Sequence, residues 1–212
     1  MPLPFSAEDL LRAIDGIAYA VDGEGIVLGF SRGPFMTAGH GGSTLPWHSE
    51  MVVGTSLFAQ MRGAEVVESY RILHRAVWTH GHQPAGFEYR CDSPETERHM
   101  RMSLSLIQAG TVPVAVLYQS ITISETARVP LPLFAADLLT GRTPAGIDDL
   151  IVKLCSYCQR VAWPEYDAVA DPEWIEASEY YWRGGVSDVV ISHAVCEQCY
   201  RRVIGQLPGS SP

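Results

Sequence analysis

The sequence is short of charge, above all positive charge, and has no long apolar run. Only 18% of its 212 residues are charged, and 24 acidic against 15 basic residues give a formal net charge of −9. No block of lysines and arginines offers the basic surface that attracts nucleic acids or anionic membranes, so we expect neither partner. No apolar stretch approaches the roughly 20 residues of a membrane-spanning helix, and the first residues do not resemble a signal peptide. These absences predict a cytoplasmic protein.

Several enzyme signatures are also missing. The glycine-rich loop 39–43 is not followed by Gly-Lys-Ser/Thr, so it is not a Walker loop. His40, His48 and Glu50 fall in or near that loop and could bind a metal, but no HExxH helix accompanies them. No phosphoacceptor helix and no cyclase signature is present. We therefore predict that the protein is not an enzyme, with a metal-dependent hydrolase as a minor alternative.

The apolar pattern predicts an α+β domain over residues 1–127. Two apolar runs flank Gly23–Gly25 and indicate a hairpin, while helical spacing predicts a helix over 64–80. Alternating residues after 85 predict three further strands, which hairpins would join into an antiparallel sheet with helices on one face. We expect the sheet side chains to include Tyr19, Val21, Val27, Phe87, Tyr89, Met102, Leu104, Val116 and Tyr118.

Two polar or reactive features of this domain, one cysteine and a group of arginines, have ordinary interpretations. Cys91 follows Phe87 and Tyr89 at period two, so we expect an inert, buried thiol. Arg90, Arg98 and Arg101 fall on the opposite phase or in a turn, where a solvated sheet face is expected.

The other four cysteines form two CxxC motifs, Cys155–Cys158 and Cys196–Cys199, separated by residues 159–195. Each motif can present two thiolates on one side of a tight turn, and two motifs complete the tetrahedral shell of a structural zinc ion. His193 is a fifth candidate ligand that we expect to lie outside the shell. Zinc and iron both suit such a site, and the sequence does not choose between them.

These motifs define a second predicted unit, residues 148–212, joined by a Pro-rich linker over 128–147. So small a unit has a marginal apolar core, and we expect the metal to supply most of its stability. The spacer contains an expected helix over 172–182. Large aromatic residues should pack beside the metal, namely Trp163, Trp174, Tyr180 and Trp182.

The first domain resembles the PAS family of bacterial sensor domains. The resemblance is carried by Ile17-Ala-Tyr-Ala-Val-Asp-Gly-Glu-Gly-Ile-Val, by Gly54-Thr-Ser-Leu-Phe and by Phe87-Glu-Tyr-Arg-Cys-Asp-Ser-Pro, over about residues 6–125. It implies a five-stranded antiparallel sheet whose inner face and helices enclose a ligand or a plain core. A ligand would lie between the sheet and the 64–80 helix, against Tyr70, Leu73 and His74.

The second unit resembles a cysteine module found on many bacterial PAS and response-regulator proteins. Leu154-Cys-Ser-Tyr-Cys-Gln-Arg and Ser192-His-Ala-Val-Cys-Glu-Gln-Cys-Tyr carry this resemblance, although Ala194 and Glu197 depart from the usual Gly and Pro. The two resemblances imply a non-enzymatic signalling or sensor protein that acts through a protein partner. A haem- or redox-responsive sensor, using His74 or the CxxC pairs, is the alternative.

An apolar stripe near the N-terminus allows a homodimer. PAS domains commonly dimerise through an N-terminal helix, and Leu10, Leu11 and Ile14 form such a stripe here. The same residues could instead pack on the domain's own sheet.

Overall fold

The larger part of the molecule is a five-stranded antiparallel sheet. The computed structural model describes residues 6–31, 52–81, 85–135, 150–164 and 172–205. The strands are β1 (Ile17–Val21), β2 (Val27–Phe30), β3 (Ala85–Arg90), β4 (Thr96–Ala109) and β5 (Val112–Ala127), in the order β2-β1-β5-β4-β3. The α+β architecture with a five-stranded antiparallel sheet, predicted from the sequence, is confirmed.

Local sequence explains two hairpins of this sheet. Between β1 and β2, the Asp22 carboxylate accepts the backbone N–H groups of Glu24 and Ile26, and Gly25 takes a positive φ of 89°. β4 and β5 are joined through Gly110, which also has a positive φ. The two strands pair from Thr96↔Ala127 to Ala109↔Val112, so they form the long centre of the sheet.

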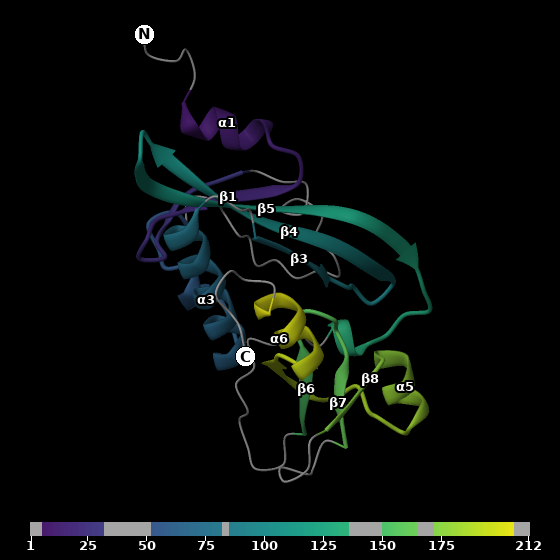
Figure 1. The fold of residues 1–212 in the computed structure, drawn as a ribbon. Coiled ribbons are helices and arrows are strands. Elements are labelled where there is room, and N and C mark those ends of the chain that lie inside the picture. The colour runs from purple at the N-terminus through teal and green to yellow at the C-terminus, as the bar shows by residue number, and fades with distance from the viewer. Residues whose placement is uncertain (1–5, 32–51, 82–84, 136–149, 165–171, 206–212) are drawn as a thin grey trace.

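Helices lie on both faces of the sheet, so the prediction that they cover one face is wrong (Figure 1). The short helix α1 (Ala7–Ala13) begins at Ser6, which forms a capping box with Asp9, and its buried Leu11 reaches Gly29 of β2. The opposite face carries the 3-10 turn η3 (Phe58–Gln60) and α3 (Ala64–His80), whose bounds match the predicted helix. No helix in these described ranges is both long and apolar enough to cross a membrane.

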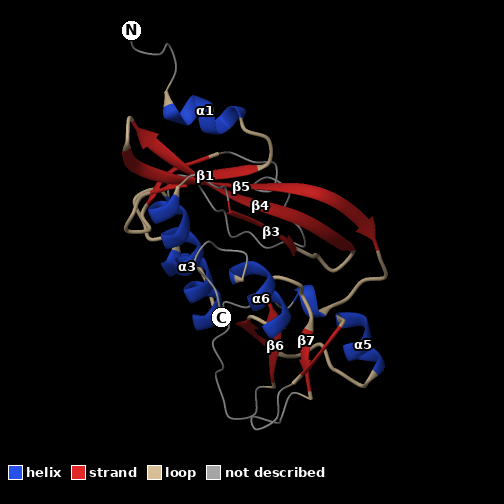
Figure 2. Cartoon of the chain, in the orientation of Figure 1, coloured by secondary structure: helices blue, strands red, loops and turns tan. Residues whose placement is uncertain are grey.

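The cysteine-bearing part builds a second, smaller sheet. Its strands are β6 (Ile151–Cys155), β7 (Val161–Trp163), β8 (Glu173–Ile175) and β9 (Val190–Ala194), in the order β8-β7-β6-β9. β6 and β9 are parallel, whereas the other pairs are antiparallel. Two short helices complete this part, α5 (Ala177–Trp182) and α6 (Glu197–Ile204); we call β6–β9 with α5 and α6 the cysteine module (Figure 2).

The cysteine module packs on the same face of the large sheet as α3, and α6 lies beside α3 (Figure 1). The main-chain N–H of Arg90 donates to the carbonyl of Tyr157 at 2.7 Å. The Glu65 carboxylate accepts from the N–H of Val195 at 3.0 Å. The Arg90 guanidinium also donates to Glu176 at 2.8 Å. Two hydrogen bonds from Arg90 of β3 and one to Glu65 of α3 therefore hold the module against the sheet and its helix.

The apolar core follows this docking. One cluster combines the inner face of the large sheet and α3 with residues of the cysteine module; its buried members are Val21, Val27, Val52, Leu57, Leu73, Val77, Phe87, Met102, Leu104, Val116, Tyr118, Cys155, Tyr157, Cys196, Cys199, Val203 and Ile204. A second cluster, with Val152, Val161, Ile175 and Tyr180 among its members, belongs to the module. Leu133 and Phe134, from the predicted linker, are buried in this second cluster. The metal-binding end of the module thus shares the core of the large sheet.

Several sequence-based expectations are wrong in detail. Pro172–Trp182 is not one helix, because residues 173–175 pair with β7 as β8 before α5 begins. Trp182 is 85% exposed and does not pack beside the cysteines. Cys91 is exposed, because β3 ends at Arg90 and the alternation stops before it.

The prediction that the arginines lie on a solvated sheet face is wrong for Arg98. Arg98 is only 4% exposed, and its guanidinium donates to Glu125 and to the carbonyl of Cys91. Arg101 does lie on an exposed face, where it pairs with Glu88. Because strand phase alone cannot show which face another part of the chain covers, the burial of Arg98 was not visible in the sequence.

Candidate metal centre

The first CxxC motif sits in a tight turn at the end of β6. The N–H of Cys155 donates to the carbonyl of Arg160 at 2.8 Å, and the N–H of Gln159 donates back to Cys155 at 2.9 Å. Gln159 has a positive φ of 60°, which closes the turn. These bonds bring Cys158 back beside Cys155, as the CxxC spacing predicts.

The second CxxC motif sits at the start of α6. Cys196 is the N-cap residue of this helix, and its sulfur accepts the N–H of Cys199 at 3.4 Å. Parallel pairing of β6 with β9 places Ala194 opposite Cys155, so the second motif follows directly beside the first. The N–H of Cys196 accordingly donates to the sulfur of Cys155 at 3.4 Å.

All four sulfur atoms lie within 4.8 Å of one another. The Sγ atoms of Cys158 and Cys196 are 3.8 Å apart, close to the roughly 3.8 Å expected between ligands of a tetrahedral zinc with Zn–S bonds of about 2.3 Å. Three of the cysteines are buried and Cys158 is half-buried, and none is in a disulfide. The geometry therefore fits one four-coordinate, thiolate-bound metal ion.

The thiols are strongly coupled through hydrogen bonds. The contact with Cys158 holds the pKa of Cys155 well below its usual value, and the same contact raises the pKa of Cys158. The pKa of Cys199 is also raised, chiefly by its contact with Cys155. A thiolate at Cys155 is thus stabilised by protons on its neighbours. A metal ion would replace those protons with a single positive centre.

Arginine side chains lie around the cluster. Arg202 donates to the sulfur of Cys199 at 3.5 Å and to the carbonyl of Glu88, in β3, at 3.2 Å. Arg160 donates to Glu176 at 2.9 Å. Four thiolates around Zn²⁺ carry a net negative charge, which an adjacent guanidinium offsets. Arg202 also connects the metal centre directly to the large sheet.

His193 lies on β9, close to the cluster but outside its four sulfur ligands. Its Nδ1 is 3.2 Å from the hydroxyl of Ser156. Among the described residues, the group that could hold a metal ion contains the four cysteines alone. His40, His48 and Glu50 lie outside the described residues.

The residues predicted to line a PAS ligand site are packed against other side chains. Tyr70 stacks on Tyr157 of the cysteine module, with ring centroids 6.2 Å apart, and meets the edge of Phe87 at 6.0 Å. Leu73 is 1% exposed and belongs to the shared core. Side chains of α3, β3 and the cysteine module thus meet between the sheet and α3.

His74 lies in a stack of aromatic rings. Its Nδ1 is 2.9 Å from the hydroxyl of Tyr118, and its ring stacks between Tyr118 and Trp78. Its Nε2 is buried and has no hydrogen-bond partner among the described residues. Burial lowers the pKa of His74, so the neutral imidazole is favoured.

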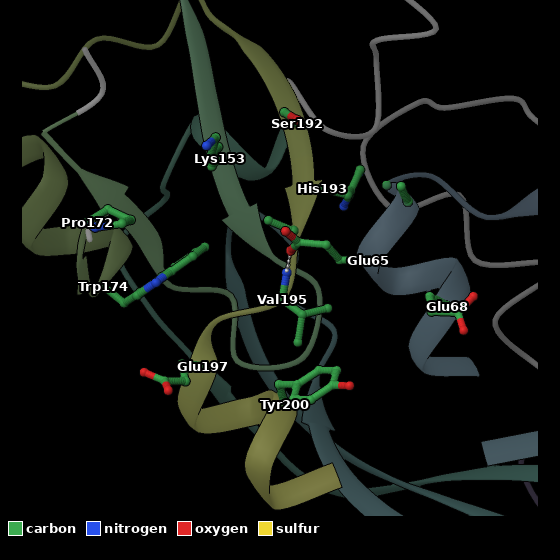
Figure 3. A pocket seen from close by; sticks show the side chains of 13 residues that line it. Glu65, Glu68, Lys153, Pro172, Trp174, Ser192, His193, Val195, Glu197 and Tyr200 are labelled. Atoms are coloured by element: carbon green, nitrogen blue, oxygen red, sulfur yellow. Dashed lines mark hydrogen bonds between the residues drawn. The ribbon is translucent and has the colours of Figure 1, made fainter. Parts of the chain in front are cut away.

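A groove of about 910 Å³ opens beside the metal centre (Figure 3). It lies between the start of α3, the strands β6, β8 and β9, and α6. Its wall combines acidic side chains, Glu65, Glu68 and Glu197, with the aromatic rings of Trp174 and Tyr200. The Glu65–Val195 hydrogen bond crosses it and joins the two parts of the molecule.

No family model and no curated protein sequence matches this chain. Among solved structures it is similar to VqmA bound to DPO, with 11% identity, a TM-score of 0.41, and coverage of 54% of this chain and 56% of VqmA. The match therefore spans little more than half the length of VqmA.

Two further similar structures are shorter. The PAS domain of Bordetella pertussis BvgS shares 13% identity over 55% of this chain and 82% of its own, with a TM-score of 0.33. A domain of an HTR-like protein from Haloarcula marismortui shares 15% identity over 51% and 97%, with a TM-score of 0.34. All three TM-scores lie below 0.5.

The burial of Tyr157 was not predicted from the sequence. Tyr157 lies inside the first CxxC motif, yet it is only 1% exposed and contacts α3 and β3. The available sequence signal for its burial was a large aromatic residue between two candidate metal ligands. Its partners could not be identified without knowing how the module docks.

Proposed function

We propose that this protein is a non-enzymatic signalling protein in which a PAS-like domain is joined to a structural zinc centre. Cys155, Cys158, Cys196 and Cys199 would hold the ion. The observation that carries the proposal is the convergence of these four sulfurs within 4.8 Å, inside a core that the large sheet shares.

The chemistry of the donor set favours a structural role for the metal. Four thiolates complete the tetrahedral shell of zinc and leave no position for water or substrate. Bound zinc would supply no reaction here. It would hold the end of β6 and the start of α6 together, and with them the face of the module that contacts the sheet.

The protein would then transmit its signal by binding a protein partner, which can be a second copy of the same chain. The net charge of −9 supports a protein partner over nucleic acid or an anionic membrane. On α1, Leu11 is buried against the domain while Leu10 is 50% exposed, so part of the N-terminal stripe is available for a second chain.

Metal analysis of the natively purified protein, combined with its absorption spectrum, tests the proposal. We expect one zinc per chain and no visible absorption bands. Iron with thiolate charge-transfer bands, or a Soret band, would instead support a redox or haem sensor. Protein free of any metal, purified without chelators under reducing conditions, would overturn the proposed centre.

A further inference from the structure

Tyr157 lies within the sequence of the cysteine module, but its side chain contacts the large sheet and α3. It is the third residue of Cys155-Ser-Tyr-Cys158, and its ring lies between α3 and β3. The centroid of the Phe87 ring is 5.1 Å away in an edge-on arrangement, and that of Tyr70 is 6.2 Å away in a stacked one. This is the space where a ligand of the PAS-like domain was predicted.

The hydroxyl of Tyr157 is also satisfied by the sheet domain. It lies 2.7 Å from the hydroxyl of Ser69, which is buried on α3. Ser69 donates its own proton to the carbonyl of Val66 at 2.7 Å, so the Tyr157 O–H is the donor to Ser69.

A second tyrosine in the module provides the contrast. Tyr200 follows Cys199 directly, as Cys158 follows Tyr157, so both tyrosines adjoin a candidate metal ligand. Tyr200 is 43% exposed, whereas Tyr157 is 1% exposed. Adjacency to a cysteine therefore does not require burial, and the contacts of Tyr157 with the sheet domain are specific to that residue.

The conformation that directs Tyr157 inward is that of the CxxC turn. Main-chain hydrogen bonds among Cys155, Gln159 and Arg160 close the turn, and the N–H of Arg90 donates to the carbonyl of Tyr157. The turn follows a five-residue strand, and β6 and β7 are in register at one pair, Leu154↔Val161. A metal bound to Cys155 and Cys158 would fix both ends of the turn around Tyr157. Without the metal, only main-chain hydrogen bonds would hold the turn in this conformation.

We propose that Tyr157 is the internal ligand of a phenol-sized site between the large sheet and α3, and that metal at the cysteine centre keeps it there. Loss of the metal releases Tyr157 and leaves a site suited to a small aromatic molecule with one hydroxyl, lined by Tyr70, Phe87 and Ser69. This inference rests on the proposed metal centre and gives that centre a means of acting on the PAS-like domain.

The first experiment compares Tyr157→Ala with Tyr200→Ala, using phenol as the probe. Emptying a buried aromatic site should lower the melting temperature of Tyr157→Ala by about 10 °C, while metal content stays at the wild-type value. Phenol at about ten times its dissociation constant should raise that melting temperature by roughly 3 °C, and should leave Tyr200→Ala and the metal-loaded wild type unchanged. Equal melting temperatures for the two variants, or equal phenol effects on all three proteins, would overturn the proposal.

The second experiment measures amide hydrogen exchange before and after chelation of the reduced protein. We expect chelation to raise exchange in β3 and in α3 around Ser69 at least tenfold. In Tyr157→Ala these amides should already exchange faster and respond little to chelation. A response confined to the cysteine module, with α3 and β3 unchanged, would show that the metal does not act through Tyr157.

The two experiments separate failure of this inference from failure of the proposed function. If purified protein binds no metal, the zinc centre is wrong, yet the melting temperatures of the two tyrosine variants still report whether Tyr157 fills the site. If metal binds and Tyr157→Ala behaves like Tyr200→Ala, the centre stands and the link to the sheet is wrong.

Discussion

The two sheets of this protein are held together in different ways. In the large sheet, β4 and β5 pair along 14- and 16-residue strands, and α3 covers the inner face over 17 residues. In the cysteine module, strands are three to five residues long, and β6 meets β7 at one registered pair. Long strands and a helix can define a fold through repeated local pairing. We propose that the module depends more on the four sulfurs that join its distant segments.

Replacing one sulfur should therefore have the largest effect, and mainly on one region. We expect Cys196→Ser to lose the metal and to unfold the module, because structural zinc contributes on the order of 10 kcal/mol of apparent binding free energy. Limited proteolysis should cut residues 150–205 rapidly and leave the five-stranded sheet resistant. Cys91→Ser is the matched control, since Cys91 is exposed and lies outside the cluster. Full metal content with unchanged resistance would mean that another group completes the site.

Asp92 tests how firmly the two regions are joined. Its side chain is fully buried and pairs with Arg90 and with Arg128, at 2.8 Å for the latter, while Arg90 also reaches Glu176 of the module. We expect Asp92→Asn to reduce the free energy of unfolding by about 3–5 kcal/mol, because two guanidinium groups would lose their buried counter-charge. Urea denaturation measures this loss.

The control for Asp92 is an exposed ion pair on the same sheet. Glu88 and Arg101 are both more than half exposed and lie 2.8 Å apart. Glu88→Gln should change the free energy of unfolding by less than about 1 kcal/mol, since exposed pairs are well solvated. Equal losses for the two variants would mean that the buried cluster contributes nothing beyond an ordinary surface pair.

Sequence patterns predicted the large sheet well, and the reason is local. Alternation places Phe87, Met102, Leu104 and Tyr118 on the inner face, and helical spacing sets α3 at Ala64–His80. Each pattern extends over enough residues to specify an element without knowledge of its neighbours.

Prediction from periodic patterns fails where elements are short, or where a residue is buried only because another part of the chain packs on it. Residues 173–175 form a strand only because β7 lies beside them, and no periodicity exists over three residues. The CxxC spacing predicted that the cysteines converge, but it carried no information about the sheet beneath them. The inward position of Tyr157 and the burial of Arg98 follow from contacts between segments far apart in sequence.

Two glycines allow a smaller comparison, because Gly63 lies against the cysteine module and Gly54 does not. Gly63, at the start of α3, and Gly54 have nearly equal φ values of 84° and 83°. A Cβ atom on Gly63 would lie 2.3 Å from the carbonyl oxygen of His193 in the module, whereas one on Gly54 meets nothing within 4 Å. Both alanine variants incur strain from a positive φ, and Gly63 also has a ψ of 120°, outside the left-handed helical region.

The difference between these variants combines the greater backbone strain at Gly63 with the contact of α3 with β9, and amide exchange at that contact separates the two. We expect Gly63→Ala to lose about 1–2 kcal/mol more than Gly54→Ala in urea denaturation, because α3 and β9 must separate to admit the methyl group. Exchange of the Val195 amide, which donates to Glu65, should rise in the first variant alone. Identical losses would indicate that the two surfaces separate at no cost.

The smallest expected effect concerns pH and lies wholly within the large-sheet region. Burial lowers the pKa of His74 below its usual 6.5, and the nearby Asp22 acts in the opposite direction but more weakly. The folded state then holds fewer protons at this site than the unfolded state near and below pH 6.5. The stabilisation from neutral His74 is complete above pH 6.5 and is lost as the pH falls through the folded-state pKa.

His74→Phe should remove this part of the pH dependence. Between pH 7.5 and 5.5 the wild type should lose more stability than the variant, and urea midpoints measured across that range give the difference. Loss of the bond to the Tyr118 hydroxyl adds a constant that does not vary with pH, so the slope is the informative quantity. His80→Ala is the control, because His80 is exposed at the end of the same helix. Acid weakening of a thiolate-bound metal affects all three proteins alike and cancels in the comparison. Equal slopes for wild type and His74→Phe would show that His74 binds the same number of protons in the folded and unfolded states over this range.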